Sequence, residues 1–300
     1  GEAPGVTPAR NEHITDPKNG ELDMLFLFDH VGVDQAVSKW DVVPFEVRNL
    51  RARMADQQAA VKNAGWASLF FCNHDQPRVV SRWGNDSDRE SRELSAKAFG
   101  MLLHMHRGTP YIYEGEELGM TNAHFTELGQ YRDLEAINAY RQRVEEAKCQ
   151  SSESMQWDAS KYAGFTAADA ATEPWISVNP NRVEINAAEE FDDPESVYSF
   201  YKKLIAMRHN NATIATGEWN LLDADDDQVY AFTRTSGDDT ILVIVNVSDK
   251  SSDVPTQVAD LLAGGINESQ VLLSTYDAMR SVKSIARGEL ARWEGVVIQL

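Results

Sequence analysis

The sequence predicts an α/β fold followed by a smaller β-rich domain, because its pattern changes once along the chain. From residue 20 to about residue 210, short apolar runs alternate with longer helical patterns, as they do in repeated βα units. After residue 213, β-rich runs separated by Gly, Asp and Ser replace that alternation. We therefore expect an α/β barrel domain at residues 1–212 and a small antiparallel β-sandwich domain at residues 213–300.

The apolar runs of the first region are expected to be strands, at residues 22–28, 66–72 and 111–113. Helical spacing of apolar residues predicts a first helix at residues 47–63, with Gly65 as its stop signal. Further helices are expected at about 89–106 and 193–209. We expect Asp192, Asp193, Pro194 and Glu195 to form the cap and first turn of the last one.

Three runs of the second region predict strands of the sandwich, at residues 229–234, 240–247 and 295–300. The acidic run at 223–227 is expected to be a solvated turn. A calcium loop of the EF-hand type would need Gly at its sixth position and a closing Glu. We therefore expect no metal.

Composition narrows the classes of partner. A formal net charge of -19 and a pI near 4.7 repel nucleic acid and anionic membrane surfaces, whereas a neutral sugar fits. Cys72 and Cys149 favour reduced thiols in a cytoplasmic protein, with Cys72 packed in the core. The sequence contains neither a long apolar stretch nor a signal-peptide pattern, and no nucleotide-binding fingerprint indicates a cofactor.

The strongest site signal is the stretch at residues 70–78, where an apolar run ends in a polar cluster. The carboxyl end of a buried strand is where α/β folds place catalytic and ligand-binding groups, so Asp75 is the first candidate. Alternatively, Asp75 is a helix-cap or turn carboxylate and His74 an ordinary surface histidine. The residues alone leave both interpretations open.

Six short segments of the sequence, here called words, resemble motifs of the α-amylase family of glycoside hydrolases in the order in which the family has them. The type that they resemble is the oligo-1,6-glucosidase type of α-glucosidase. They are GEAPGVT (1–7), LDMLFLFDH (22–30), NHDQPRVVSRWGND (73–86), GTPYIYEGEELGMTN (108–122), MQWDASKYAGFT (155–166) and EPWISVNPNRVEIN (173–186). The resemblance implies the carboxy-terminal part of a (β/α)8 TIM barrel, followed by a small β-sandwich domain without catalytic residues.

Members of this family cleave with retention, using two carboxyl groups that flank the bond. The resemblance implies that Glu2 is the general acid/base. Asp75 would grip adjacent hydroxyls of the glucose and stabilise the oxocarbenium-like transition state, and His74 would donate a hydrogen bond to the same sugar. Arg78 would fix the carboxylates or line the leaving-group side, with a structural salt bridge as the alternative. The glutamates at residues 114–117 are expected to be architectural.

Two departures from the family pattern matter. The family nucleophile is an Asp in a Gly-x-Arg-x-Asp word upstream of the acid/base, and no such word precedes Glu2. We therefore expect this chain to be the carboxy-terminal part of an enzyme and to be inactive alone. A run resembling Arg-Asp-Asn-x-Arg-Thr-Pro is also missing before Met155 and Gln156, where the family lines its glucose pocket.

The expected parent is a cytoplasmic, exo-acting α-glucosidase that removes terminal glucose from short α-1,6- or α-1,4-linked oligosaccharides and needs no cofactor. Within the family, trehalose-6-phosphate hydrolysis, sucrose cleavage and transglucosylation stay open. A different class would be a non-catalytic carbohydrate-binding remnant, and the presence of both Glu2 and Asp75 argues against such decay.

Overall fold

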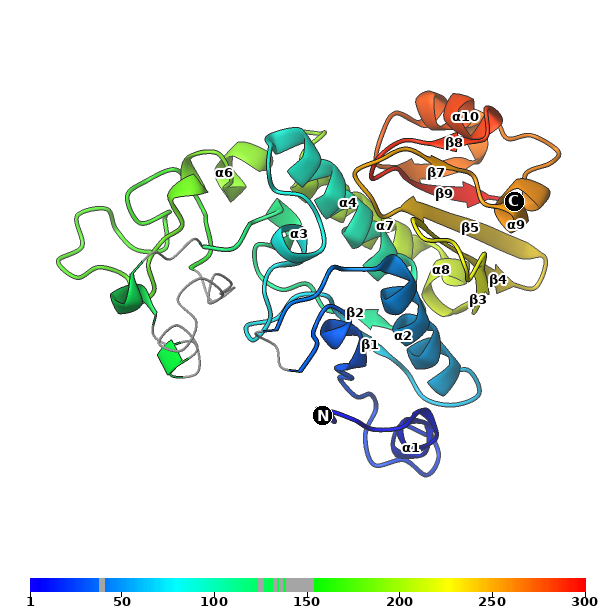
Figure 1. Ribbon diagram of the computed structural model, residues 1–300, viewed down its shortest axis with the longest axis horizontal. Helices are drawn as coiled ribbons and strands as arrows, with labels where there is room; N and C mark the ends of the chain where they lie inside the picture. The colour runs from blue at the N-terminus through cyan, green and yellow to red at the C-terminus, as the bar shows by residue number, and fades with distance from the viewer. Residues whose placement is uncertain (38–40, 124–126, 132–133, 135–136, 139–153) are drawn as a thin grey trace.

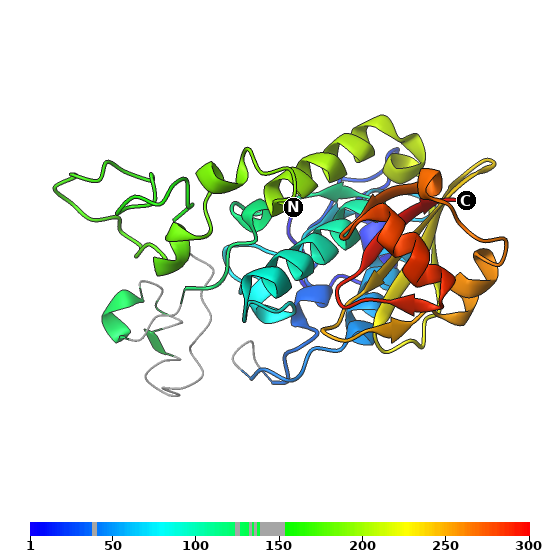
Figure 2. The same cartoon turned by 90° about the horizontal axis from the view of Figure 1, so that it is seen from above.

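The computed structural model describes residues 1–37, 41–123, 127–131, 134, 137–138 and 154–300. Its α/β part lies beside an antiparallel sheet that contains the carboxyl terminus (Figure 1). In both views the segment from residue 154 to α6 (Ala187–Glu190) projects from the α/β part, on the side away from that sheet (Figures 1 and 2).

Short parallel segments form the sheet of the α/β part. Strand β1 (Ser68–Leu69) pairs in parallel with β2 (Thr109–Pro110), and single parallel bridges join Leu25 to Ala67 and Glu2 to Phe26. The four segments therefore lie side by side in chain order. Two of the predicted runs, 22–28 and 66–72, contain paired residues, but the third pairs at 109–110 rather than at 111–113.

Gly108 explains the position of β2. Its φ of +146° and its closeness to the neighbouring strand exclude a side chain, since a Cβ there would lie 2.6 Å from the carbonyl oxygen of Ala67. The backbone N–H groups of Thr109 and Tyr111 then donate to the carbonyls of Ala67 and Leu69 at 2.8 and 2.7 Å. The close approach at Gly108 thus fixes the register two residues before the apolar run.

The long helices of the α/β part are α2 (Val47–Ala60), α4 (Arg89–Met105) and α7 (Val197–Asn210), which confirms the three predicted helices. The predicted start of the last one is wrong. Ser196 caps α7, since its Oγ accepts from the N–H of Ser199 at 3.1 Å, and residues 192–195 form the preceding turn.

The shorter helical elements connect these parts. They are α1 (Pro8–Ile14), η1 (Asp29–Gly32), α3 (Val79–Arg82), η2 (Glu116–Leu118), η3 (Leu128–Gln130), η4 (Pro180–Val183), α8 (Ala212–Thr216), α9 (Thr256–Leu261), η5 (Glu268–Gln270) and α10 (Ala278–Ala286). None of the described helices is long and apolar enough to cross a membrane.

The carboxy-terminal sheet has five antiparallel strands in the order β3-β4-β5-β9-β7. They are β3 (Glu218–Leu222), β4 (Val229–Ser236), β5 (Asp239–Asn246), β7 (Val271–Ser274) and β9 (Gly295–Gln299), and a separate pair joins β6 (Ser252–Asp253) to β8 (Glu289–Leu290). All three predicted strands of this region are confirmed.

Successive side chains of β4 point to opposite faces of the sheet, and both faces are buried. Tyr230 and Phe232 pack with the helices of the α/β part, while Val229 and Ala231 pack against α9, α10 and Leu290 of β8. The second layer of the small domain is therefore two helices and a short strand pair. One continuous core holds the five-stranded sheet against the barrel helices.

The acidic run at 223–227 is a turn between β3 and β4. Oδ1 of Asp226 accepts from the N–H groups of Gln228 and Val229, and Arg51 of α2 donates to the carbonyls of Ala224 and Val229 at 2.5 and 2.6 Å. Among the described residues, no group of three His, Cys, Asp or Glu side chains is arranged to hold a metal ion.

Candidate active site

The carboxyl ends of the four parallel segments meet at one edge of the α/β part, because parallel strands all end on the same side. Glu2 lies in the first segment, and the turn with His74 and Asp75 follows β1. Between them lies the segment 25–28, which bridges Glu2 on one side and Ala67 on the other. The fold therefore brings the predicted acid/base and the predicted third carboxylate to a common edge.

Glu2 is held by its backbone. The N–H of Ala3 donates to the carbonyl of Phe26 at 3.2 Å, and the N–H of Phe26 donates to the carbonyl of Gly1 at 2.8 Å. The Glu2 side chain is exposed. Its carboxyl group is therefore on a fixed strand position and accessible, as a proton donor to a substrate must be.

Asp75 sits in a tight turn beyond β1. Its N–H donates to Oδ1 of Asn73 at 2.8 Å, and its Oδ2 lies 3.4 Å from Nε2 of His74. The Asp75 and His74 side chains are 60% and 72% exposed. In the described part of the chain, the Asp75 carboxylate therefore lies in a turn and faces solvent. A barrel pocket takes its walls from the loops after all eight strands, and four parallel segments are described here.

Arg78 is buried at 1% exposure. Its N–H donates to Oδ1 of Asn122 at 2.7 Å, its Nη1 donates to the carbonyl of Glu114 at 2.9 Å, and its guanidinium lies 5.3 Å from the ring centre of Tyr113. These contacts join the turn after β1 to the chain after β2. Direct contact between Arg78 and a substrate stays a prediction.

Asn122 extends this connection to the projecting segment. Nδ2 of Asn179 donates to the carbonyls of Thr121 and Asn122, both at 3.3 Å, and Nδ2 of Asn181 donates to Oγ1 of Thr121 at 2.8 Å. The words at 73–86, 108–122 and 173–186 are therefore in direct contact, although they are separate in sequence.

A buried ion pair supports the other side of the Asp75 turn. The Arg82 and Asp34 side chains are 7% and 2% exposed; Nε of Arg82 donates to Oδ2 of Asp34 at 2.7 Å, and a second contact joins Nη2 to Oδ1. Nη1 of Arg82 also donates to Oε1 of Gln76, next to Asp75, at 2.8 Å. The pair thus ties the residues after η1 to the turn.

The chain after β2 contains a buried carboxyl group, in η2. Glu116 is 4% exposed, and Oε1 accepts from the hydroxyl of Tyr201 at 2.9 Å. Burial raises the pKa of Glu116 to about 7, against the opposing effect of the Tyr201 hydrogen bond. Cys72 packs beside it, and burial raises the pKa of this thiol, in agreement with the predicted core position. Glu116 thus joins the chain after β2 to Tyr201 of α7 and to Cys72, and its architectural role stays a prediction.

Sequence reasoning missed Asp34, Arg82 and Asn122. Arg82 lies inside the word at 73–86, so the resemblance itself was a signal for it. Asp34 has no local signal, since its partner is 48 residues away.

Comparison with known proteins identifies the family. The model described as Alpha amylase, catalytic domain, matches residues 1–217, and that described as Maltogenic Amylase, C-terminal domain, matches residues 219–266. The chain belongs to the α-amylase family. The resemblance and the fold class, a later part of a (β/α)8 barrel with an antiparallel domain after it, are confirmed.

Relatives within the family differ in their named activities. The chain is 39% identical to the oligo-1,6-glucosidase of Parageobacillus thermoglucosidasius, over 100% of this chain and 54% of the relative. It is 36% identical to the trehalose-6-phosphate hydrolase of Bacillus subtilis, over 100% of this chain and 54% of that relative. The chain therefore spans about half the length of the curated relatives that it matches.

Solved α-amylase family structures agree with this relation. The trehalose-6-phosphate hydrolase of Bacillus licheniformis superposes with a TM-score of 0.87 at 35% identity, over 100% of this chain and 55% of the other. The isomaltulose synthase of Klebsiella sp. superposes with a TM-score of 0.84 at 30% identity, over 99% of this chain and 55% of the other. The run expected before Met155 falls next to residues 139–153, which lie outside the described part, so its loss stays a prediction.

Proposed function

We propose that this chain is the acid/base-bearing half of a retaining α-glucosidase of the oligo-1,6-glucosidase type, acting on terminal α-glucosidic bonds of short oligosaccharides. The observation that carries the proposal is the parallel register, which brings Glu2 and the Asp75 turn to one edge across segment 25–28. The relatives' names supply the substrate class.

Each residue has a distinct chemical role in this proposal. Protonated Glu2 donates its proton to the leaving glycosidic oxygen and then, as a carboxylate, removes a proton from the water that releases the product. Asp75 accepts hydrogen bonds from sugar hydroxyls and stabilises the positive charge that develops on the ring, while His74 donates to the same sugar. Attack on the anomeric carbon requires a second carboxylate, which the family supplies from an Asp upstream of the acid/base.

The proposal is tested by comparing this chain alone with a chimera, in which the amino-terminal half of the Parageobacillus thermoglucosidasius enzyme precedes it. The chain alone should not hydrolyse a chromogenic α-glucoside, because no covalent glycosyl intermediate forms without the nucleophile. The chimera should release glucose from isomaltose, first as the α-anomer in proton NMR spectra. Equal turnover by the two proteins, or initial release of the β-anomer, would contradict the proposal.

Variants of the chimera separate the proposed roles. Glu2→Gln should abolish cleavage of isomaltose but spare the first step with aryl glucosides whose leaving groups need no proton, and azide should restore turnover. Asp75→Asn should lower turnover of both substrate classes by orders of magnitude. Glu114→Gln is the matched control, since this exposed glutamate is near the site but has no proposed role. A Glu2→Gln variant equally impaired on all substrates would exclude the acid/base role.

Trehalose-6-phosphate hydrolysis is the second candidate, because a hydrolase of that name matches the whole chain at 35% identity. Parallel assays of the chimera with isomaltose, maltose and trehalose 6-phosphate decide between them. The proposal also includes a cytoplasmic location, a division into domains at 1–212 and 213–300, and no nucleic-acid or membrane partner.

A further inference from the structure

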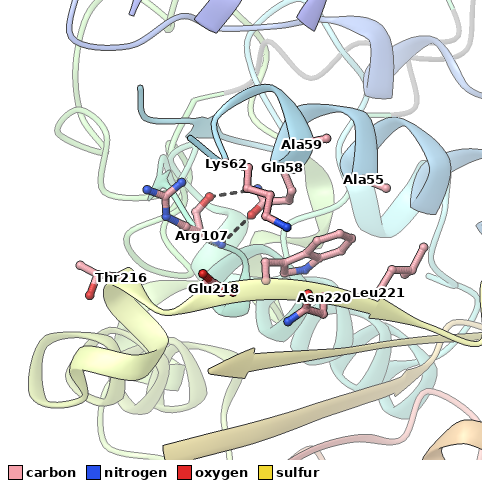
Figure 3. Close-up of a pocket in the computed structure, with 10 residues that line it drawn as sticks. Ala55, Gln58, Ala59, Lys62, Arg107, Thr216, Glu218, Asn220 and Leu221 are labelled. Atoms are coloured by element: carbon pink, nitrogen blue, oxygen red, sulfur yellow. Dashed lines mark hydrogen bonds between the residues drawn. The ribbon is translucent and has the colours of Figure 1, made fainter. Parts of the chain in front are cut away.

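A cavity of about 360 Å³ lies in the seam between the α/β part and the carboxy-terminal sheet, apart from the edge that carries Asp75. Helix α2 forms one wall and strand β3 the other (Figure 3). The volume falls within the range of about 300–1,000 Å³ that is usual for small-molecule sites. It is lined by Ala55, Gln58, Ala59, Lys62, Arg107, Thr216, Glu218, Trp219, Asn220 and Leu221.

An aromatic ring contributes to the β3 wall. The indole of Trp219 stacks on the buried ring of His106, with centroids 5.9 Å apart and an interplanar angle of 23°, and contacts Phe232 at 5.7 Å. This packing fixes the indole against the core. The facing helix contributes Ala55 and Ala59, whose small side chains leave the space open.

The cavity is lined by side chains of both charges, positive and negative. Lys62 and Glu218 are exposed, and no side-chain hydrogen bond or ion pair within the described residues engages either of them. Arg107 is held by the carbonyl of Val61 and by the ring of Trp66, 5.0 Å from its guanidinium. Burial lowers the pKa of Arg107, and the Glu218 carboxylate acts against this effect by raising it. Cationic donors and an anionic acceptor thus stand side by side.

We propose that this cavity is a second carbohydrate site, which takes the pyranose ring of a neutral saccharide. The apolar face of a pyranose can pack on the indole. Sugar hydroxyls both donate and accept hydrogen bonds, so they can accept from the Lys62 ammonium and donate to the Glu218 carboxylate at the same time. The Glu218 carboxylate would repel an anionic ligand, and the Lys62 and Arg107 side chains would repel a cationic one. The site does not depend on the proposed hydrolysis, because no residue is shared with it.

The test is a titration of the chain with isomaltose and, separately, with maltose, followed by NMR of the Trp219 indole N–H. This N–H is a clean reporter, since it is buried and has no hydrogen-bond partner in the described structure; Trp219→Phe assigns its signal. We expect a saturable shift with a millimolar Kd, and a several-fold weaker Kd in Lys62→Met.

Two variants of α2 serve as a matched pair. Ala59→Trp fills the cavity and should abolish the shift, whereas Ala52→Trp, at an exposed position of the same helix outside the cavity, should leave it unchanged. Asp75→Asn should also leave it unchanged. No shift with either sugar, or undiminished binding in Ala59→Trp, overturns the proposal. An inactive chimera would overturn the proposed function alone, because the Trp219 signal does not require turnover.

Discussion

The buried carboxyl of Glu116 should make the stability of the protein fall as the pH rises toward neutrality. Its pKa is about 7 in the folded protein, against 4.5 for an unperturbed glutamate, because burial penalises the charged form. Between these two values the folded state binds more protons than the unfolded state. The free energy of unfolding therefore decreases with rising pH in this window and reaches its lower value above about pH 7.

The size of the effect follows from the two pKa values. A rise from 4.5 to about 7 corresponds to about 3 kcal/mol, at roughly 1.4 kcal/mol for each pKa unit. Glu116→Gln removes the ionisable group and keeps an oxygen that can accept from Tyr201. Relative to the wild type, the variant should gain about 3 kcal/mol between about pH 4.5 and 8.

Urea unfolding of both proteins at a series of pH values measures this difference, and titrating groups that do not interact with Glu116 cancel in the comparison. Exposed Glu114, two residues away, supplies the matched control as Glu114→Gln, which removes a carboxylate at the surface and should not reproduce the gain of the Glu116→Gln variant. If the Glu116→Gln and wild-type curves run parallel across the window, Glu116 is not a buried, protonated group in the folded protein.

Three further predictions concern the packing around the site. Asp34→Asn should cost about 3–5 kcal/mol in urea unfolding, because Arg82 stays buried without its counter-charge, and adding Arg82→Met should recover much of this loss. Burial lowers the pKa of His30 to about 4, so the wild type should lose about 3 kcal/mol relative to His30→Gln as the pH falls from about 6.5 to 4, measured by urea unfolding; a constant difference would contradict this. Gly100→Ala would put a Cβ 2.7 Å from the ring of Tyr201 and should lower stability by about 1–3 kcal/mol in thermal unfolding, whereas an unchanged midpoint would mean that the ring yields freely.

Local patterns predicted the elements whose stability is decided locally. The helices predicted at 47–63 and about 89–106 follow from periodicity within a single segment and are observed at 47–60 and 89–105, and the three predicted strands of the antiparallel sheet are observed as well. The start of α7 was misplaced because Asp193 and Ser196 are both good caps by residue type. Only the accepted hydrogen bond from Ser199 distinguishes Ser196.

The parallel segments were harder to predict, because an apolar run marks burial and not pairing. In the run at 66–72 only Ala67, Ser68 and Leu69 pair with neighbouring segments, while Phe70, Phe71 and Cys72 are buried by side-chain packing. Pairing depends on a segment about 40 residues away, whose register Gly108 sets. Such information is tertiary, and no window along the sequence contains it.

The same distinction separates the site residues that could be predicted from those that could not. Asp75 could be placed at a strand end from its own neighbours, but whether a cation next to it faces a substrate or the protein depends on distant partners. For Arg78 those partners are the carbonyl of Glu114 and the ring of Tyr113, so its charge serves to join two strand ends. For Arg82 the partner is Asp34, and the pair reaches the turn through Gln76. Both arginines of the word at 73–86 therefore connect the turn that carries Asp75 to the rest of the protein, and a role for the exposed Asp75 carboxylate in binding a ligand stays a prediction.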